Sequence, residues 1–225
     1  TGNFNERTAL VYADYTLITA DQRLLKESAK VFEYLRGERT KVKTRHLLVA
    51  PFSLRRGLLE IIDREIAHVR SGKRGELIVK VNSLEDEAMI LKLYEAAEAG
   101  VEVRMIVRGI CRLIPSGKER GKRIEAISIV DRFLEHARVV IARNGGNREV
   151  WLASADWMGR NLDRRVEVAF PIYDPDVRNQ IIGMIEDQLA DNSRARLLDR
   201  KMRNHYRARA DGMPEIRAQE RALAP

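Results

Sequence analysis

Hydrophobic positions along the chain follow two different periods, and their succession predicts an α/β fold. Residues 54–69 carry apolar side chains about every 3.6 positions, which is typical of a helix with one buried face. These positions are Leu54, Leu58, Ile61, Ile62, Ile66 and Val69. Ser53 is expected to cap this helix and Gly72 to end it. Short apolar runs on both sides, at 46–52 and 76–83, predict buried strands.

The next segments predict a second helix followed by another strand. Ser83 and Asp86 have the spacing of a capping box at the start of the helix, and Gly100 is expected to end it. The apolar run 101–109 then predicts a strand. A strand–helix–strand unit favours parallel pairing of its two strands through a right-handed crossover.

Strands are predicted to predominate in the region that follows. The apolar runs that predict them lie at residues 124–130, 137–144, 149–155 and 165–174. The segment "NGGN" at 144–147 predicts a hairpin turn between two of these strands. Residues 176–190 have the pattern of an amphipathic helix. Beyond residue 190 the chain is arginine-rich with little apolar periodicity, and we expect a basic helical tail that is partly exposed.

An internal repeat relates residues 1–21 to residues 154–174 at constant spacing. The residues that it pairs are Phe4 with Trp157, Arg7 with Arg160, Asp14 with Glu167, Asp21 with Asp174, and Phe32 with Ile185 in the helices that follow. Two unrelated strand-to-helix units would give a similar pattern. We favour the duplication, which predicts that residues 1–46 end one domain and that residues 47–225 form a complete second copy.

Composition limits the classes of function. The net charge of +8 predicts polyanionic partners, such as nucleic acid, phospholipid headgroups, nucleotides or polyphosphate. Aromatic residues are only 6% of the chain, so single-strand recognition by base stacking is weakly supported. The single cysteine, Cys111, excludes an internal disulfide and favours a reducing cytoplasm. Since the chain has neither an initiator methionine nor a signal-peptide pattern, we expect a fragment of a longer cytoplasmic protein.

His136 is the candidate for chemistry that the pattern singles out. It stands at the start of a predicted strand in "FLEHARVVIARNGGNREVWLASADW", which ends on small and polar residues. By itself, a histidine at a strand edge is more often structural than catalytic. The repeat predicts an equivalent histidine upstream of Thr1, which would place two histidines across a pseudo-twofold cleft.

The strand His136-x-Arg138 and the small-residue turn after it resemble the twice-repeated motif of the phospholipase D superfamily. Longer segments resemble the C-terminal catalytic region of the bacterial polyphosphate kinases, namely "TGNFNERTA", "IVRGICRLIP", "SIVDRFLEHAR" and "SADWMGRNLDRRVEV". The resemblance implies a phospholipase D-like mixed sheet flanked by helices. It also implies reversible transfer of the ATP γ-phosphate to inorganic polyphosphate through a phosphohistidine that lies before Thr1.

The resemblance and the repeat together assign catalytic roles. His136 is expected to be the second histidine, donating to the phosphate or to the leaving oxygen. Each histidine needs a carboxylate to fix its ring, and we expect a crossed arrangement: Asp14 behind His136, and Glu167 behind the upstream histidine. Alternatively, each acid pairs with a nearby arginine, such as Arg164 or Arg165.

Further residues are expected to bind ATP or phosphate. Tyr12, Arg108 and His136 match ATP-binding positions of the family. Arg108 also ends a predicted strand beside a glycine, where an arginine fork can meet phosphate oxygens. Arg138 and Lys80 are weaker candidates, each equally well explained as a solvated strand residue. Mg²⁺ is expected to accompany ATP, but the sequence shows no carboxylate cluster and no phosphate-binding glycine loop.

The chain is therefore expected to be an ATP-dependent kinase fragment, inactive without its nucleophile. Its expected partners are ATP, ADP and polyphosphate, without a specific nucleic acid. For the full-length enzyme we expect a bacterial cytoplasmic location, peripheral membrane association and homo-oligomerisation. Two alternatives remain: a phospholipase D-like phosphodiesterase or nuclease, and a non-catalytic module that binds polyanions.

Overall fold

The computed structural model describes residues 5–115, 124–201 and 203–223. Its centre is an eight-stranded mixed sheet with the strand order β10-β5-β4-β3-β7-β8-β9-β2. The strands are β2 (Leu48–Ala50), β3 (Glu76–Val81), β4 (Glu102–Val107), β5 (Ile124–Ile129), β7 (Arg138–Ala142), β8 (Glu149–Ala153), β9 (Glu167–Pro171) and β10 (Ala195–Leu197). The predicted mixed sheet flanked by helices is confirmed.

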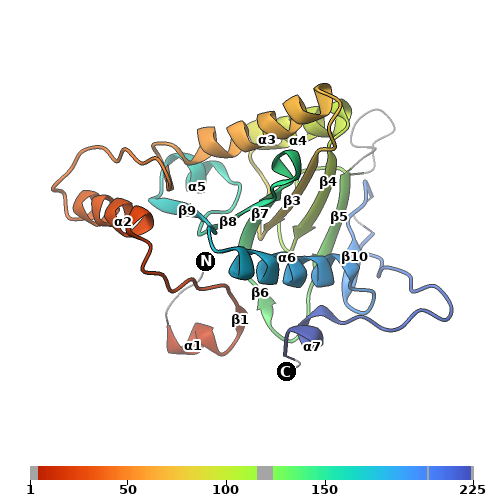
Figure 1. The fold of residues 1–225 in the computed structure, drawn as a ribbon. Helices are drawn as coiled ribbons and strands as arrows, with labels where there is room; N and C mark the ends of the chain where they lie inside the picture. The colour runs from red at the N-terminus through yellow and green to blue at the C-terminus, as the bar shows by residue number, and fades with distance from the viewer. Residues whose placement is uncertain (1–4, 116–123, 202, 224–225) are drawn as a thin grey trace.

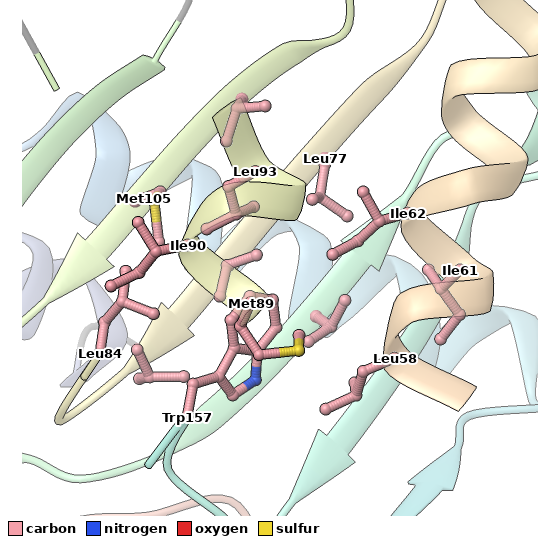
Figure 2. Close-up of a cluster of buried hydrophobic side chains, with 14 of the residues drawn as sticks. Leu58, Ile61, Ile62, Leu77, Leu84, Met89, Ile90, Leu93, Met105 and Trp157 are labelled. Carbon is pink, nitrogen blue, oxygen red and sulfur yellow. The ribbon is translucent and has the colours of Figure 1, made fainter. Parts of the chain in front are cut away.

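Helices cover both faces of this sheet (Figure 1). On one face, α3 (Leu54–Arg70) and α4 (Glu87–Ala99) pack on the odd-numbered side chains of β3, such as Leu77 and Val79. Figure 2 shows this core, in which Leu77 lies between Leu93 and Ile62 and Trp157 lies at one end of the cluster. On the other face, α6 (Pro175–Ala190) packs on Ile78 and its neighbours. The alternation follows from the period of two in a strand.

The strand–helix–strand prediction is confirmed, because β3 and β4 pair in parallel. The predicted hairpin is also present: β7 and β8 pair antiparallel, joined by the 3₁₀ turn η1 (Asn144–Gly146). The chain reverses where β3 meets β7 antiparallel in the middle of the sheet. No sequence pattern indicated that β2 would pair with β9, far from the strand that follows it in the chain.

Of the two predicted helix caps, Ser53 stands at the N-cap position of α3 without a capping hydrogen bond, and Ser83 does not cap α4. The Ser53 side chain does not cap α3; its hydroxyl instead accepts a hydrogen bond from the Val49 amide. Helix α4 is capped by Asp86, whose carboxylate accepts from the Met89 amide, and not by Ser83. The amides of Glu85 and Asp86 bind the Trp157 carbonyl, which keeps this segment extended and delays the helix. The predicted end at Gly100 is confirmed, since Gly100 adopts a left-handed conformation with φ of 106°.

The segment before β2 contains α1 (Glu6–Ala9), β1 (Tyr12–Ala13) and α2 (Gln22–Leu35). Repeat spacing is kept, because α1 and α2 begin at positions equivalent to the starts of α5 (Gly159–Asp163) and α6. Asp21 and Asp174, which the repeat pairs, each cap the helix that follows. Phe4, the proposed partner of Trp157, lies outside the described residues.

The predicted helical tail after residue 190 is wrong. Residues 195–197 instead form β10, which pairs antiparallel with β5 at the edge of the sheet. The chain then continues without helix in its described part up to α7 (Ala218–Leu223). A stretch without an apolar stripe has no face to bury as a helix, whereas the open edge of β5 offers backbone partners. In the described part of the chain, no helix combines the length and apolar character needed to cross a bilayer.

Candidate active site

One edge of the sheet collects the residues that were expected to carry chemistry. The carboxyl ends of β3, β4 and β8 and the amino ends of β7 and β9 meet there, as the strand registers require. Arg108 follows β4, Arg138 opens β7 and Glu167 opens β9. Strand ends of this kind leave side chains free to converge on a ligand.

His136 is positioned by a separate pair of short strands. In that pair, β1 lies parallel to β6 (Leu134–Glu135), with Tyr12 opposite Leu134 and Ala13 opposite Glu135. The amide of His136 donates to the Ala13 carbonyl at 3.1 Å. This pairing places Asp14, the residue after Ala13, beside His136, although more than half of the chain separates them in sequence.

The expected contact between Asp14 and His136 is present. The carboxylate oxygens of Asp14 lie 3.0 and 3.1 Å from Nδ1 of His136, and both side chains are mostly buried, at 14% and 18% exposed. Because a carboxylate only accepts, we assign the ring proton to Nδ1, which leaves Nε2 as the reactive nitrogen. No described residue hydrogen bonds Nε2. The ring of Tyr12 lies 4.6 Å from the His136 ring between centroids.

Arg138 lies beside this pair but is held by another acid. Its Nε and Nη2 donate to the two carboxylate oxygens of Asp156, at 3.3 and 3.1 Å. Its Nη1 is 3.1 Å from Nδ1 of His136. The residue is only 8% exposed, so its positive charge is fixed close to the imidazole. Asp156 also accepts from the backbone amides of Asn82 and Ser83.

Arg108 is placed to meet a ligand. Its Nε is shared between the Asn82 side-chain oxygen at 3.0 Å and the Glu135 carbonyl at 3.1 Å. No described group hydrogen bonds its two Nη atoms. A cavity of about 220 Å³ lies against Arg108, lined otherwise by Val11 and residues 129–135. Asn82 joins the two candidates, because its Nδ2 also donates to the His136 carbonyl at 3.3 Å.

Glu167 lies at the same edge but does not pair with an arginine. Its oxygens accept from the Ser154 hydroxyl and, at 2.7 Å, from Asn161 Nδ2. The alternative in which Arg164 or Arg165 neutralises it is therefore not seen among the described contacts. Glu167 is 8% exposed and is held by two neutral donors. Its predicted partner, the upstream histidine, lies outside the chain.

Lys80 does not occupy the position expected for a phosphate ligand. It is 2% exposed and faces α6, where its ammonium is paired with Glu135 and donates to Gln188 at 2.9 Å. Burial lowers the pKa of Lys80, against the opposing effect of the Glu135 carboxylate. An ammonium that is buried at 2% exposure and paired with Glu135 is not accessible to an entering phosphate. We therefore correct its role to a structural one.

Whether the site could hold a metal ion depends on the histidine, cysteine and carboxylate side chains that lie close together. No group of three or more histidine, cysteine or carboxylate side chains in the described ranges could share a metal ion. The acids at the site are bonded to His136, Arg138, Ser154 and Asn161. The described donor side chains of this site do not fit a resident Mg²⁺ site.

Comparison with known proteins decides the family. The family model described as polyphosphate kinase C-terminal domain 2 matches residues 47–219, and that of C-terminal domain 1 matches residues 1–41. The chain belongs to the polyphosphate kinase family. A polyphosphate kinase from Vibrio vulnificus is 45% identical over 219 residues, covering 97% of this chain and 31% of the relative.

Solved structures agree with this assignment. The crystal structure of polyphosphate kinase from Porphyromonas gingivalis superposes with a TM-score of 0.94 at 42% identity, covering 99% of this chain and 35% of that one. Nuc, a phospholipase D family member from Salmonella typhimurium, matches with a TM-score of 0.50 at 16% identity, covering 68% of this chain and 96% of its own. The second match supports the phospholipase D-like fold alone. The chain spans about a third of the polyphosphate kinases that it matches.

Sequence reasoning missed two residues of the candidate site, Asn82 and Asp156. Asn82 is 4% exposed and Asp156 is 7% exposed, and each bonds several groups of the site. A signal existed for both. Asn82 follows a continuous apolar strand, and Asp156 lies in the motif "SADW", so each is a polar residue at the end of a predicted strand.

Proposed function

We propose that this chain is the C-terminal catalytic part of an enzyme that transfers the γ-phosphate of ATP reversibly to inorganic polyphosphate. The cross-strand contact between Asp14 and His136 carries the proposal. A buried carboxylate behind an imidazole, with Arg138 and Arg108 at the same sheet edge, is suited to phosphoryl transfer. Such catalysis consists mainly of positioning the reactants and neutralising oxygen charge.

In the proposed reaction, a histidine upstream of this chain attacks the γ-phosphorus. The bond from phosphorus to the β,γ-bridging oxygen breaks, ADP leaves, and a terminal oxygen of polyphosphate then takes the phosphoryl group from the histidine nitrogen. His136, protonated at Nε2, donates to the phosphoryl or leaving oxygen. Asp14 holds its ring and stabilises its charge. Tyr12 and the Nη groups of Arg108 bind the nucleotide, and Glu167 supports the upstream histidine.

The charges of the nucleotide and of the arginines at the site bear on how the substrate is bound. MgATP is the proposed nucleotide substrate, and its ion partly neutralises the phosphates. Because Arg138 is already paired with Asp156, we assign it to supplying positive charge beside the site instead of binding phosphate through a free fork. The isolated chain, without the nucleophile, should make no polymer.

Other parts of the proposal rest on the resemblance and the net charge of +8. They are a bacterial cytoplasmic location, homo-oligomerisation and peripheral membrane association of the full-length enzyme, and no specific nucleic-acid partner.

The test uses the full-length protein, as wild type and as His136→Ala, with polyphosphate formation from MgATP as the measurement. We expect wild type to form polymer and the variant to lose at least about 100-fold in rate. His205→Ala is the matched control, because that side chain is exposed and outside the site. A wild type that hydrolyses phosphodiesters without ATP would support the phosphodiesterase alternative. Equal rates in both proteins would show that His136 is structural.

A further inference from the structure

The segment before His136 is held from both sides. On one side, β1 supplies backbone partners, and the Leu134 amide donates to the Val11 carbonyl at 2.8 Å. On the other side lies the chain that leads into α7, more than 80 residues later in sequence. Since β6 is only two residues long, its position depends on these neighbours.

Gln219 on α7 supplies the hydrogen bonds that a neighbouring strand would give to the backbone of Phe133. Its Oε1 accepts from the Phe133 amide at 2.9 Å, and its Nε2 donates to the Phe133 carbonyl at 2.8 Å. One side-chain amide thus satisfies both backbone groups of one residue, as a paired strand would. The same Nε2 also donates to the Glu135 carboxylate at 2.7 Å, and Gln219 is 7% exposed.

Arg217 makes a second attachment to the same segment. Its Nε and Nη2 donate to the two carboxylate oxygens of Asp131, at 2.9 and 2.6 Å. This pairing lowers the pKa of Asp131. The attachment is itself anchored, because the Ala218 amide donates to the buried carboxylate of Asp191 at the end of α6. We call residues 217–219 the C-terminal clamp. Within it, Arg217 contacts Asp131, and Gln219 contacts Phe133 and Glu135.

Glu135 connects this clamp to the site. Its carboxylate is bonded by Gln219 and, across the sheet, by Lys80. Its backbone carbonyl accepts from Arg108 Nε at 3.1 Å, and the next residue is His136. A shift of Glu135 would therefore move an anchor of Arg108 and the backbone of His136 together.

We propose that Gln219 is a positioning residue for the phosphotransfer, acting through β6 on His136 and Arg108. The inference rests on the proposed function for its kinetic consequences, but its structural part stands separately. Gln219→Met keeps the volume and the helix propensity while it removes both hydrogen-bonding groups. Arg221→Gln is the matched control, because it removes only an exposed ion pair from α7 to Asp187.

Hydrogen exchange in the full-length protein tests the structural part without reference to activity. We expect the backbone amides of residues 131–136 to exchange about tenfold faster in Gln219→Met than in wild type, because local opening becomes easier. The control should exchange like wild type. Unchanged exchange in Gln219→Met would overturn the clamp, whatever reaction the protein catalyses.

Steady-state kinetics test the functional part. A loss of folded enzyme lowers kcat but leaves KM unchanged, whereas a displaced Arg108 also weakens ATP binding. We expect Gln219→Met to lower kcat about tenfold and to raise the KM for ATP about threefold or more. Unchanged values, or a lower kcat at constant KM, would overturn the positioning role. If wild type makes no polyphosphate, the proposed function fails, and the exchange result alone decides on the clamp.

Discussion

At the scale of single residues, the same chemical type has different roles according to its neighbours. Asp14 and Glu167 occupy equivalent repeat positions, yet Asp14 bonds an imidazole whereas Glu167 bonds a hydroxyl and an amide. Lys80 and Arg108 both lie at strand ends near the site. Lys80 is buried in an ion pair, whereas no described group hydrogen bonds the Nη atoms of Arg108. Residue type suggested candidates, but the partners decide their roles.

Asp14→Asn is the substitution that probes the assigned tautomer. The amide keeps the shape but cannot hold the His136 ring by charge, so we expect the rate of polyphosphate formation to fall about 10- to 100-fold. The measurement is kcat of the full-length protein. Asp21→Asn, a partly exposed helix cap in the same segment, should remain within about twofold of wild type. A rate for Asp14→Asn within that range would contradict the role.

At the scale of helices and strands, local patterns predicted most elements, and contacts decided their ends. The start of α4 moved because the Trp157 carbonyl binds two amides of the preceding turn. Residues 195–197 became a strand because β5 had an open edge. The two short strands β1 and β6 carry no local pattern strong enough to predict them, since each is stable only through its partner.

Leu93 tests how far α4 depends on the core shown in Figure 2. Its side chain is fully buried, so Leu93→Ala should lower the free energy of unfolding by about 2–5 kcal/mol through lost burial and a cavity. Leu91 lies on the same helix but is 48% exposed, and Leu91→Ala should cost less than about 0.5 kcal/mol. Urea denaturation of the 225-residue chain measures both. Equal losses would show that α4 does not pack as described.

At the scale of the whole molecule, a buried acid ties the two parts of the chain together. Glu27 on α2 accepts from the backbone amides of Arg45, His46 and Leu47, at 2.7, 2.9 and 2.8 Å. Burial by itself would raise the pKa of Glu27, but these amides outweigh it and lower the pKa below the ordinary 4.5. The carboxylate therefore fixes α2 against the segment that leads into β2.

Glu27→Gln predicts how stability depends on pH. Because the folded-state pKa is lowered, the stabilisation is complete above the unfolded pKa of 4.5 and is lost as pH falls through the folded value. We expect the variant to be less stable by about 2 kcal/mol near neutral pH. The difference from wild type should shrink below about pH 4. Thermal unfolding of both chains over this pH range measures it, and a constant difference would contradict the assignment.

The sequence by itself indicated most of the strand and helix succession and the family. It also predicted the contact of Asp14 with His136, because the repeat aligned Asp14 with Glu167 and led us to expect a crossed pairing of acids and histidines. Only the tertiary structure decided that β1 pairs with β6, that Lys80 is buried, and that Asn82, Asp156 and Gln219 hydrogen bond residues at or next to the candidate site. The physical reason is range: periodicity and caps act over a few neighbouring residues, whereas these contacts join residues that only the folded sheet brings together.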